Sequence, residues 1–317
     1  MRALVTGGAG FIGSNLVDKL IDDGHEVIIF DDLSTGSQYN INDKAKFFKV
    51  DISDKNVFVK RKPLDFNQNY TMEDVMTDVD VVFHTAAKAR VQPSIQNPVE
   101  FNDVNVTGTL NMLKACVDYG VHRFIYSSSS SVYGNVEQLP TPESHKLNPM
   151  SPYALQKLMG EQYCRLFSEL YGLETICLRY FNVYGDRMSL DGAYKLVIPI
   201  FVGQKINGEP MTIRGDGQQK RDFTYVGDVV DANIKCMDYP LELNGEAFNI
   251  GNGDNRSVNQ IANMIGGDTI NVEPVIEPKE TLADNSKVKK VLGWKTTMKI
   301  EDWIKTYKEK IGIWIIK

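Results

Sequence analysis

Short apolar runs alternate with longer amphipathic segments through the first part of the chain. The apolar runs predict strands near residues 2–6, 26–31, 46–51, 80–84, 122–128 and 174–179. The amphipathic segments predict helices near residues 11–23, 95–119 and 152–171. This alternation is typical of an α/β fold with a doubly wound, mostly parallel sheet. Ligands of such sheets bind at the carboxyl ends of the strands, so the chemistry is expected there.

The regular alternation stops after Tyr184, where shorter elements punctuated by Gly and Pro predict a second, smaller α/β domain for the substrate. Residues 248–251 read as a strand that returns to the sheet. We therefore expect a sheet domain of residues 1–182 and about 222–252, with the smaller domain formed by residues 183–221 and 253–317. The segment 303–317 is expected to be an amphipathic helix that packs its apolar stripe.

A glycine pattern follows the first predicted strand directly. Gly7, Gly10 and Gly13 form GxxGxxG, which lets the backbone turn tightly and approach a pyrophosphate at the start of a helix. The second strand ends in Asp31 and Asp32, about 20 residues further on. A carboxylate at that point binds the adenosine ribose hydroxyls and repels a 2′-phosphate, so the pattern predicts NAD rather than NADP.

Two further segments carry candidate chemistry. Tyr153 and Lys157 lie four residues apart on a predicted helix that Ser151 and a proline open, so their side chains emerge on one face. A tyrosine has a pKa near ~10, so it acts as a base at neutral pH only beside positive charge, which Lys157 and an oxidised nicotinamide would supply. A run of five serines, residues 127–131, ends the apolar strand expected to face the cofactor.

Composition narrows the class of protein. A net charge of −6 without a basic stripe argues against a nucleic-acid surface. The four cysteines form no CxxC pair, which indicates buried thiols in a reducing compartment, and the histidines show no metal-ligand grouping. No apolar run approaches the ~18 residues of a membrane span, and no signal segment is visible. We expect a cytoplasmic protein without a metal or a membrane partner.

Five motifs together resemble the extended short-chain dehydrogenase/reductase family, and within it the nucleotide-sugar 4-epimerases. They are GxxGxxG, the serine-rich strand end before VYG at 132–134, SPYxxxK at 151–157, LRYFNVYG at 178–185 and GDGxxxRDFxYV at 215–226. The resemblance covers nearly the whole chain. It implies a Rossmann-type fold and an enzyme that epimerises a UDP-sugar with bound NAD through a 4-keto intermediate.

The resemblance also assigns roles to residues. Ser129 and Tyr153 would be catalytic and contact the sugar, with Tyr153 as acid and base and Lys157 on the nicotinamide ribose. It implies cofactor contacts at Gly7, Gly10, Phe11, Ile12, Gly13, Asp31, Asp51, Ile52, Ala86, Asn105, Tyr153 and Lys157. Asn182 and Arg221 match contacts to the substrate diphosphate.

Two features bear on the sugar. Residues 192–194, Gly-Ala-Tyr, resemble epimerases of UDP-N-acetylhexosamines. Thr281 stands where a bulky tyrosine narrows the pocket of some members, so it implies room for an acetamido group. We therefore expect UDP-N-acetylglucosamine and its galacto epimer, with UDP-glucose as a further substrate. One departure is that this chain has Pro-Val-Ile-Glu-Pro-Lys-Glu at 274–280 where the family usually carries Arg-Glu-Gly-Asp, so that Lys279 would offer a point charge in place of an arginine fork.

Several alternatives stay open or are disfavoured. The related dehydratases carry an Asp-Glu pair where this chain has Ser130 and Ser131, which argues against dehydration. A UDP-glucuronate epimerase or a decarboxylase remains possible, since Arg90, Arg187 or a backbone amide would meet a carboxylate. A non-catalytic NAD-binding regulator would show a damaged Ser/Tyr/Lys set, whereas this set is intact.

Three structural expectations complete the reading. His84 ends a strand and is expected to be a hydrogen-bonded structural residue rather than a catalyst. The segment 55–70 is expected to be a solvent loop. The helices at 95–119 and 152–171 resemble those that pair as a four-helix bundle across the family's dimer, so we expect a homodimer.

Overall fold

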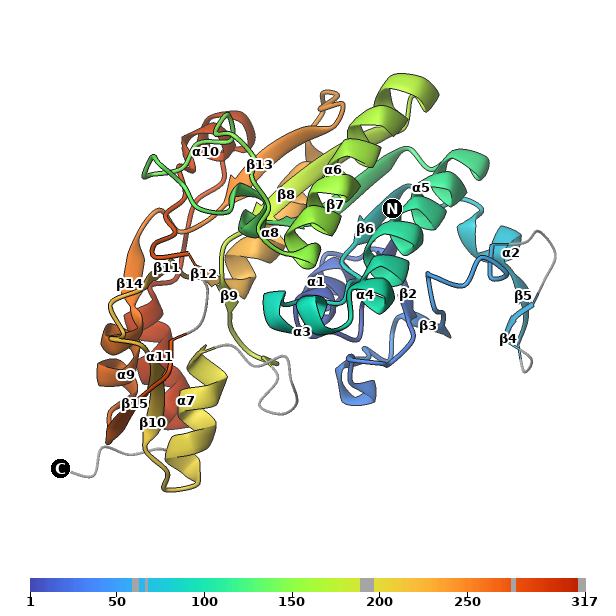
Figure 1. The fold of residues 1–317 in the computed structure, drawn as a ribbon. Helices are drawn as coiled ribbons and strands as arrows, with labels where there is room; N and C mark the ends of the chain where they lie inside the picture. The colour runs from blue at the N-terminus through green and yellow to red at the C-terminus, as the bar shows by residue number, and fades with distance from the viewer. Residues whose placement is uncertain (59–62, 66–67, 189–196, 275–277, 313–317) are drawn as a thin grey trace.

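A seven-stranded sheet forms the centre of the computed structural model, which describes residues 1–58, 63–65, 68–188, 197–274 and 278–312 (Figure 1). The strand order is β13-β8-β7-β6-β1-β2-β3, and every neighbouring pair is parallel. The strands are β1 Arg2–Thr6, β2 Glu26–Asp31, β3 Lys46–Lys49, β6 Val81–His84, β7 Arg123–Ser129, β8 Glu174–Tyr180 and β13 Glu246–Ile250. The predicted doubly wound α/β fold is confirmed, including the returning strand near residue 248.

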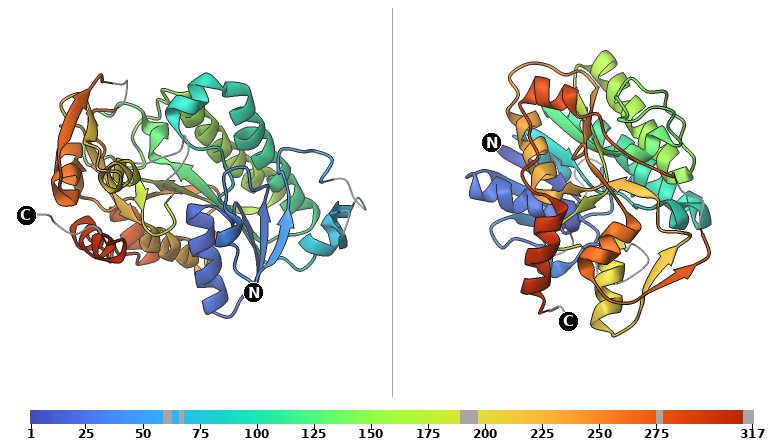
Figure 2. Two further views of the ribbon diagram at one scale, coloured as in Figure 1. Left: turned by 90° about the horizontal axis from the view of Figure 1, so that it is seen from below. Right: turned by 90° about the vertical axis from the view of Figure 1, so that its left-hand side faces the viewer.

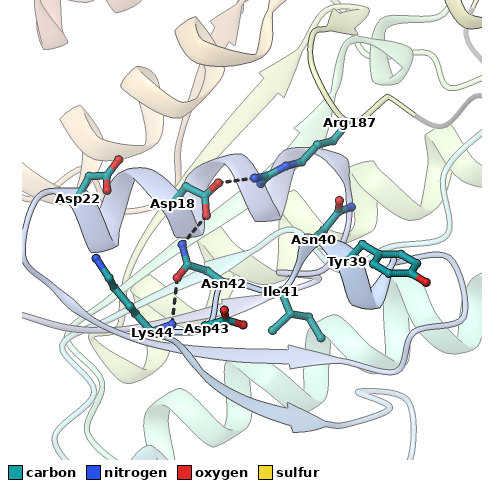
Figure 3. Close-up of a pocket in the computed structure, with 9 residues that line it drawn as sticks. All are labelled: Asp18, Asp22, Tyr39, Asn40, Ile41, Asn42, Asp43, Lys44 and Arg187. Atoms are coloured by element: carbon teal, nitrogen blue, oxygen red, sulfur yellow. Dashed lines mark hydrogen bonds and ion pairs between the residues drawn. The ribbon is translucent and has the colours of Figure 1, made fainter.

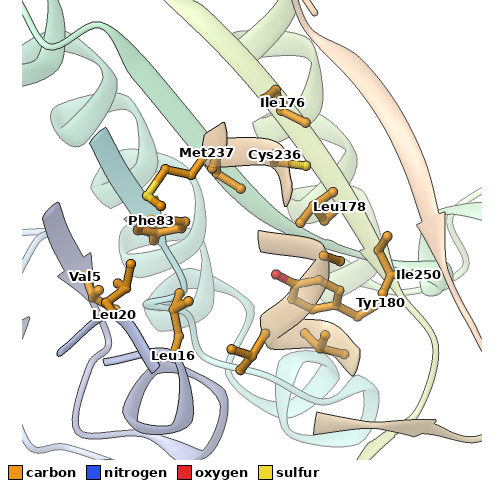
Figure 4. Close-up of a cluster of buried hydrophobic side chains, with 14 of the residues drawn as sticks. Val5, Leu16, Leu20, Phe83, Ile176, Leu178, Tyr180, Cys236, Met237 and Ile250 are labelled. Atoms are coloured by element: carbon orange, nitrogen blue, oxygen red, sulfur yellow. The ribbon is translucent and has the colours of Figure 1, made fainter. Parts of the chain in front are cut away.

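Helices cover both faces of this sheet (Figure 2). On one face, Leu16 and Leu20 of α1 (Phe11–Asp22) and Met237 of α8 (Val226–Asp238) pack on Val5 and Phe83 (Figure 4). The opposite face is covered by α5 (Thr109–Asp118) and α6 (Pro152–Tyr171). Burial on both faces explains why the strands read as continuous apolar runs rather than as alternating patterns.

The chain reverses its direction of strand addition at β1. The chain goes outward from β1 to β2 and β3, then returns to the other side of β1 as β6. Ligand crevices of open α/β sheets lie at such a switch point, outside the carboxyl ends of the two central strands. Here the two central strands end at Thr6 of β1 and at His84 of β6, and these two residues pair in the sheet.

The single helix predicted over 95–119 is divided into four pieces. They are α3 (Val91–Gln96), α4 (Pro98–Asn102), a π-helical turn (Asp103–Gly108) and α5. Pro98 lacks an amide proton and disfavours helical backbone at Asn97, whose φ is −129° and ψ 57°. The helix therefore restarts at Pro98, and the π turn that follows places Asn105 against the site described below.

The second region has its own core. Phe201 of α7 (Val197–Ile206), Ile213 of β10 (Met211–Arg214), Ile261 of α9 (Val258–Ile265) and Trp303 of α11 (Ile300–Lys310) pack together. β10 pairs in parallel with β15 (Thr269–Val272). The C-terminal helix starts at Ile300, slightly earlier than predicted, and residues 313–317 of that prediction lie outside the described residues.

Short pairings join the two regions. β9 (Val183–Tyr184) pairs in parallel with β12 (Thr224–Tyr225), and β11 (Lys220–Asp222) pairs antiparallel with β14 (Asn255–Ser257). Within the segment assigned to the smaller domain, α10 (Ser286–Leu292) instead packs Val288 and Leu292 into the core beneath the large sheet. The division into 1–182 with 222–252 and 183–221 with 253–317 stays a prediction.

The segment 55–70, expected to be a loop, contains two short strands. β4 (Pro63–Asp65) and β5 (Gln68–Thr71) form an antiparallel pair, while residues 59–62 and 66–67 lie outside the described ones. Helix α2 (Met72–Met76) follows, and Thr71 and Asp74 cap it reciprocally. Short 3₁₀ turns at Gln38–Asn40 and Ser130–Tyr133 complete the elements.

Candidate active site

The glycine loop between β1 and α1 leaves no room for side chains. Gly7 has φ +72°, and a Cβ there would lie 2.7 Å from the amide nitrogen of Ala86. A Cβ on Gly13 would lie 2.2 Å from the carbonyl oxygen of Gly7. The loop therefore passes between the ends of β1 and β6 with only backbone exposed, which is the surface that a pyrophosphate requires.

The N-terminus of α1 supplies the matching electrostatics. Gly10 is the N-cap and offers no side-chain cap, and the first turn carries no acidic residue. The amides of Phe11 and Ile12 at the start of this 12-residue helix have no partner within the helix, and the helix dipole favours negative charge beside them. The residues present thus fit the pyrophosphate of a dinucleotide.

Asp31 links the glycine loop to the end of β2. Its carboxylate accepts the backbone N–H of Ala9 at 3.0 Å and that of Leu33 at 2.8 Å, and burial raises its pKa. Asp32 is more exposed and accepts the N–H and hydroxyl of Ser34. Asp31 therefore lies where the ribose acceptor was predicted and also fixes the shape of the loop.

The other predicted cofactor residues lie at the ends of β3 and β6 and on the π turn. Asp51 accepts the hydroxyl of Ser53 at 2.6 Å, and Ile52 beside it is buried. Asn105 accepts the N–H of Lys88 at 2.8 Å and donates to the carbonyl of Lys88 and to Gln156. Asn105 thus ties the segment after β6 to helix α6.

Ser129 and Tyr153 come together from different elements. Ser129 ends β7, and Tyr153 lies in the first turn of α6, which Ser151 caps as predicted by accepting the N–H of Ala154. Burial raises the pKa of Tyr153, while a hydrogen bond with Ser129 and the positive charge of Arg90 act in the opposite direction. The arrangement gives a phenol whose ionisation depends on its neighbours.

Lys157 lies one helical turn beyond Tyr153 and is buried. Its Nζ donates to the carbonyl oxygen of Ser127 at 2.7 Å and lies 4.9 Å from the ring centroid of Tyr126. Burial lowers the pKa of Lys157 to about 8, against the opposing charge of Glu161. The ammonium is therefore held at the carboxyl end of β7, the strand that ends with Ser129.

The substrate-side residues converge from three distant parts of the chain. Ser129 pairs with Tyr180 in the sheet register, so the chain leaves β8 toward Asn182 at the same edge. Asn182 donates to the hydroxyl of Thr281 at 3.4 Å, and the N–H of Asp222 donates to it at 3.2 Å. Arg221 precedes Asp222 on β11, so the backbone that carries Arg221 lies beside Asn182 and Thr281.

Two sequence features bear differently on this group. Lys279 accepts the N–H of Lys220 through its backbone carbonyl, so its segment runs beside β11. Residues 192–194, whose sequence resembles epimerases of UDP-N-acetylhexosamines, lie outside the described residues.

His84 is structural, as predicted. It is fully buried, and its ring nitrogens lie 2.9 Å from the hydroxyl of Thr6 and 3.0 Å from that of Thr109. Burial and the charge of Lys157 lower the pKa of His84 to about 3. Both ring nitrogens of this buried imidazole are committed to hydroxyls of β1 and α5, as expected for a structural residue.

Sequence reasoning missed a buried ion pair between α6, which carries Tyr153 and Lys157, and β8. Arg179 donates to Glu161 through Nε at 2.9 Å and Nη2 at 2.7 Å, and both side chains are buried. Glu161 also accepts the hydroxyl of Ser128, and Arg179 donates to Tyr133 at 2.8 Å. The available signal was the spacing of Glu161, four residues after Lys157 on the same helix face.

Arg187, one of the two arginines considered for a carboxylate substrate, lies elsewhere. It forms an ion pair of 2.6 Å with Asp18 of α1 (Figure 3). The pocket around it, about 470 Å³, is lined by Asp18, Asp22, Tyr39, Asn40, Ile41, Asn42, Asp43, Lys44 and Arg187. None of the predicted catalytic residues lines this pocket. The ion pair with Asp18 commits the charge of Arg187 to α1.

Comparison with known proteins decides the family. Residues 3–251 match the model of the NAD-dependent epimerase/dehydratase family. The chain belongs to this family. A UDP-glucose 4-epimerase of Mycolicibacterium smegmatis is 36% identical to this chain over 312 residues, which cover 96% of each protein. The chain is therefore an NAD-dependent nucleotide-sugar epimerase, as the motifs implied.

Two solved epimerase structures share its fold. The UDP-glucose 4-epimerase of Thermotoga maritima, solved with UDP-glucose, has a TM-score of 0.88 and 36% identity over 98% of this chain and 100% of that one. The UDP-N-acetylglucosamine 4-epimerase of Methanobrevibacter ruminantium, solved with UDP-N-acetylmuramic acid, has a TM-score of 0.87 and 35% identity over 98% of each. The family model names NAD as the cofactor, and these two relatives are named for different UDP-sugars.

Two further expectations concern bulk properties. All four cysteines are buried and free, as predicted. Among the described residues, no helix is long and apolar enough to cross a membrane, and no cluster of three or more His, Cys, Asp or Glu side chains is arranged to hold a metal ion.

Proposed function

We propose that this epimerase interconverts UDP-N-acetylglucosamine and UDP-N-acetylgalactosamine, and UDP-glucose and UDP-galactose more slowly. The proposal is supported by Thr281, a small side chain whose hydroxyl already accepts hydrogen bonds from Asn182 and from the N–H of Asp222. Because those bonds hold the hydroxyl against β11, the side chain adds little bulk on the substrate side. An acetamido group needs that space, and a hexose hydroxyl does not fill it.

Tyr153 is the proposed acid and base. In its ionised form the phenolate removes the proton from the 4-hydroxyl, and it returns a proton to the same oxygen when the ring is reduced from its other face. Ser129, hydrogen-bonded to Tyr153, donates to the same sugar oxygen and stabilises the charge that develops there. The observation that carries the proposal is this Ser129–Tyr153 contact at the edge of the sheet that Gly7 borders.

Lys157 has two proposed tasks. Its ammonium, placed one turn from Tyr153, favours the phenolate and binds the ribose next to the nicotinamide. The carbonyl of Ser127 and the ring of Tyr126 hold it there. NAD, when bound, supplies the reversible hydride acceptor at carbon 4, so the overall reaction has no net redox change.

The remaining proposed contacts hold the cofactor and the substrate diphosphate. Gly7, Gly10, Phe11, Ile12 and Gly13 would bind the pyrophosphate. The other proposed cofactor contacts are Asp31, Asp32, Asp51, Ile52, Ala86 and Asn105. Asn182 and Arg221 would bind the substrate diphosphate, with Lys279 as a single additional charge.

The test is to incubate the protein separately with UDP-N-acetylglucosamine, UDP-glucose and UDP-glucuronate and to follow each by proton NMR. We expect the axial 4-epimer of the first, and of the second at a lower kcat/KM. Turnover of UDP-glucuronate alone would refute the choice of sugar. Return of all three unchanged by NAD-loaded protein would refute the proposal as a whole.

We also propose a homodimer formed through α6 and α4. The exposed side chains of Leu155, Met159, Leu166 and Leu170 follow one another at spacings of four and seven on α6, which places them on one outward face. Beside them, a groove of about 470 Å³ is lined by Pro98, Asn102, Pro149, Met150, Ser151, Pro152, Leu155, Gln156 and Met159. A second copy of the same face would bury this apolar surface with two-fold symmetry.

Light scattering after size exclusion tests the dimer. Leu155→Glu combined with Leu166→Glu should yield a monomer. Leu241→Glu, at an exposed leucine outside the stripe, should leave the dimer intact. A wild-type monomer, or a dimer that survives the double substitution, would contradict this interface.

A further inference from the structure

Arg90 has a backbone conformation that its residue type rarely adopts. It lies between the end of β6 and the start of α3, with φ 100° and ψ 139°. Positive φ at this value is disfavoured for residues with a Cβ, whereas glycine reaches it freely. Backbone strain of this kind persists only where the surroundings enforce it, and it concentrates at functional sites.

The side chain of Arg90 points into the protein rather than into solvent. Its Nε atom is completely buried, and burial lowers the pKa of the guanidinium while Tyr153 acts in the opposite direction. In return, the charge of Arg90 lowers the pKa of the Tyr153 phenol. A long cationic side chain that turns inward beside a catalytic phenol differs from an ordinary surface arginine.

The local packing brings the two residues together. Arg90 caps α3, and one turn later Ser94 is buried and accepts the backbone N–H of Tyr153 at 3.1 Å. The start of α3 is thus fixed against the start of α6. On the other side, Asn105 holds the backbone of Lys88, two residues before Arg90, to Gln156 of α6. The segment that carries Arg90 is therefore anchored to the catalytic helix on both sides.

We propose that Arg90 is a positioning charge for Tyr153: the anchored segment holds its backbone at positive φ so that the guanidinium stabilises the phenolate, in addition to Lys157. This inference rests on the proposed role of Tyr153. It assigns a function to a residue that the SPYxxxK motif does not contain. It also gives a reason for an arginine at a position whose backbone favours glycine.

Other titratable groups also face this phenol. Tyr126 of β7 interacts electrostatically with Tyr153, and Lys157 lies on the same helix with its Nζ directed to Ser127. Burial, and after it the charge of Lys157, lower the pKa of His84 of β6. A positive charge near a phenol favours its ionised form, so Lys157 would act in the same direction as Arg90 and would remain in place when Arg90 is replaced.

Arg90→Gly provides a sharp test because the structural and the electrostatic roles predict opposite results. Glycine removes the strained φ and should maintain or raise the Tm. It also removes the charge, so the Tyr153 phenolate should form about one pH unit higher, with about tenfold lower kcat/KM on the acid limb. Arg90→Gln, which loses the charge and keeps the strained backbone, should give the same shift. Arg90→Lys should retain most of the wild-type behaviour.

The measurement uses the NAD-loaded protein in two ways. The ultraviolet absorbance change on pH titration, taken as the difference from Tyr153→Phe, reports phenolate formation without any substrate. The pH profile of kcat/KM then reports the same ionisation during turnover. Because the first readout needs no reaction, it tests Arg90 even if the substrate proposal fails.

Arg187→Gly is the matched control. Arg187 also has positive φ, 69°, but pairs with Asp18 on α1, so its replacement should leave the phenolate titration unchanged. A higher phenolate pKa in Arg90→Gly and Arg90→Gln but not in Arg187→Gly supports the proposal. An unchanged titration in both Arg90 variants, or an equal shift in Arg187→Gly, would overturn it.

Discussion

Replacement of His84 should change how stability depends on pH. The imidazole is fully buried and lies within hydrogen-bonding distance of the hydroxyls of Thr6 and Thr109, and its pKa in the folded protein is about 3. In the unfolded chain a histidine has a pKa of about 6.5. As the pH falls below ~6.5, the unfolded state therefore binds a proton that the folded state refuses, and stability is lost.

The size of this effect follows from the two values. At pH 5 the solution lies about 1.5 units below the unfolded pKa, and each unit corresponds to about 1.4 kcal/mol. His84 should thus reduce the free energy of unfolding by about 2 kcal/mol between pH 7.5 and pH 5. In His84→Gln the amide stays neutral, so that component disappears even if the variant is less stable at every pH.

Urea unfolding at several pH values between 7.5 and 5 measures this difference. The wild-type curve should fall more steeply than that of His84→Gln by about 2 kcal/mol across the range. His122→Gln is the control, since the side chain of His122 is 74% exposed and remains solvated in both states. Parallel pH dependences of the wild type and His84→Gln would refute the reasoning that the imidazole stays neutral in the fold.

Three further predictions concern the cofactor loop, the buried ion pair and the dimer. Gly13→Ala should lose NAD, measured by calorimetric titration, because its Cβ would meet Gly7 O at 2.2 Å, whereas Gly203→Ala, with open space around it, should keep NAD. Arg179→Met should lower the free energy of unfolding in urea by about 3–5 kcal/mol by leaving Glu161 buried without its ion partner. The additional change Glu161→Leu should recover part of that loss, and no recovery would contradict the ion-pair argument. If α6 forms the dimer, dilution should lower the wild-type Tm but not that of the Leu155→Glu, Leu166→Glu variant.

The strongly periodic parts of the fold were predictable because local sequence and tertiary structure agree there. β1, the glycine loop and α1 follow one another as GxxGxxG requires, and Ser151 with Pro152 marks the start of α6. The predicted helix over 95–119 failed in detail because one proline outweighs an amphipathic pattern. Pro98 divides the helix, and the subsequent π turn leaves no mark in the hydrophobic spacing.

The site was predictable where a motif is contiguous and less so where it is assembled from distant segments. Tyr153 and Lys157 share one helix, so their spacing predicts a shared face. The contact of Asn182 with Thr281 joins residues 99 apart in the chain, and only the fold brings them together. Arg90 lies in none of the five motifs. Its proposed role beside Tyr153 is inferred from its backbone angle and from its charge near the phenol.

Transfer of a labelled hydrogen tests the central claim most directly. A UDP-N-acetylglucosamine with deuterium at carbon 4 should give its 4-epimer with the deuterium retained at that carbon, because the same hydride leaves and returns within one bound complex. Tyr153→Phe should still bind NAD and give no labelled epimer. Deuterium lost to solvent during epimerisation, or full activity in Tyr153→Phe, would contradict the account.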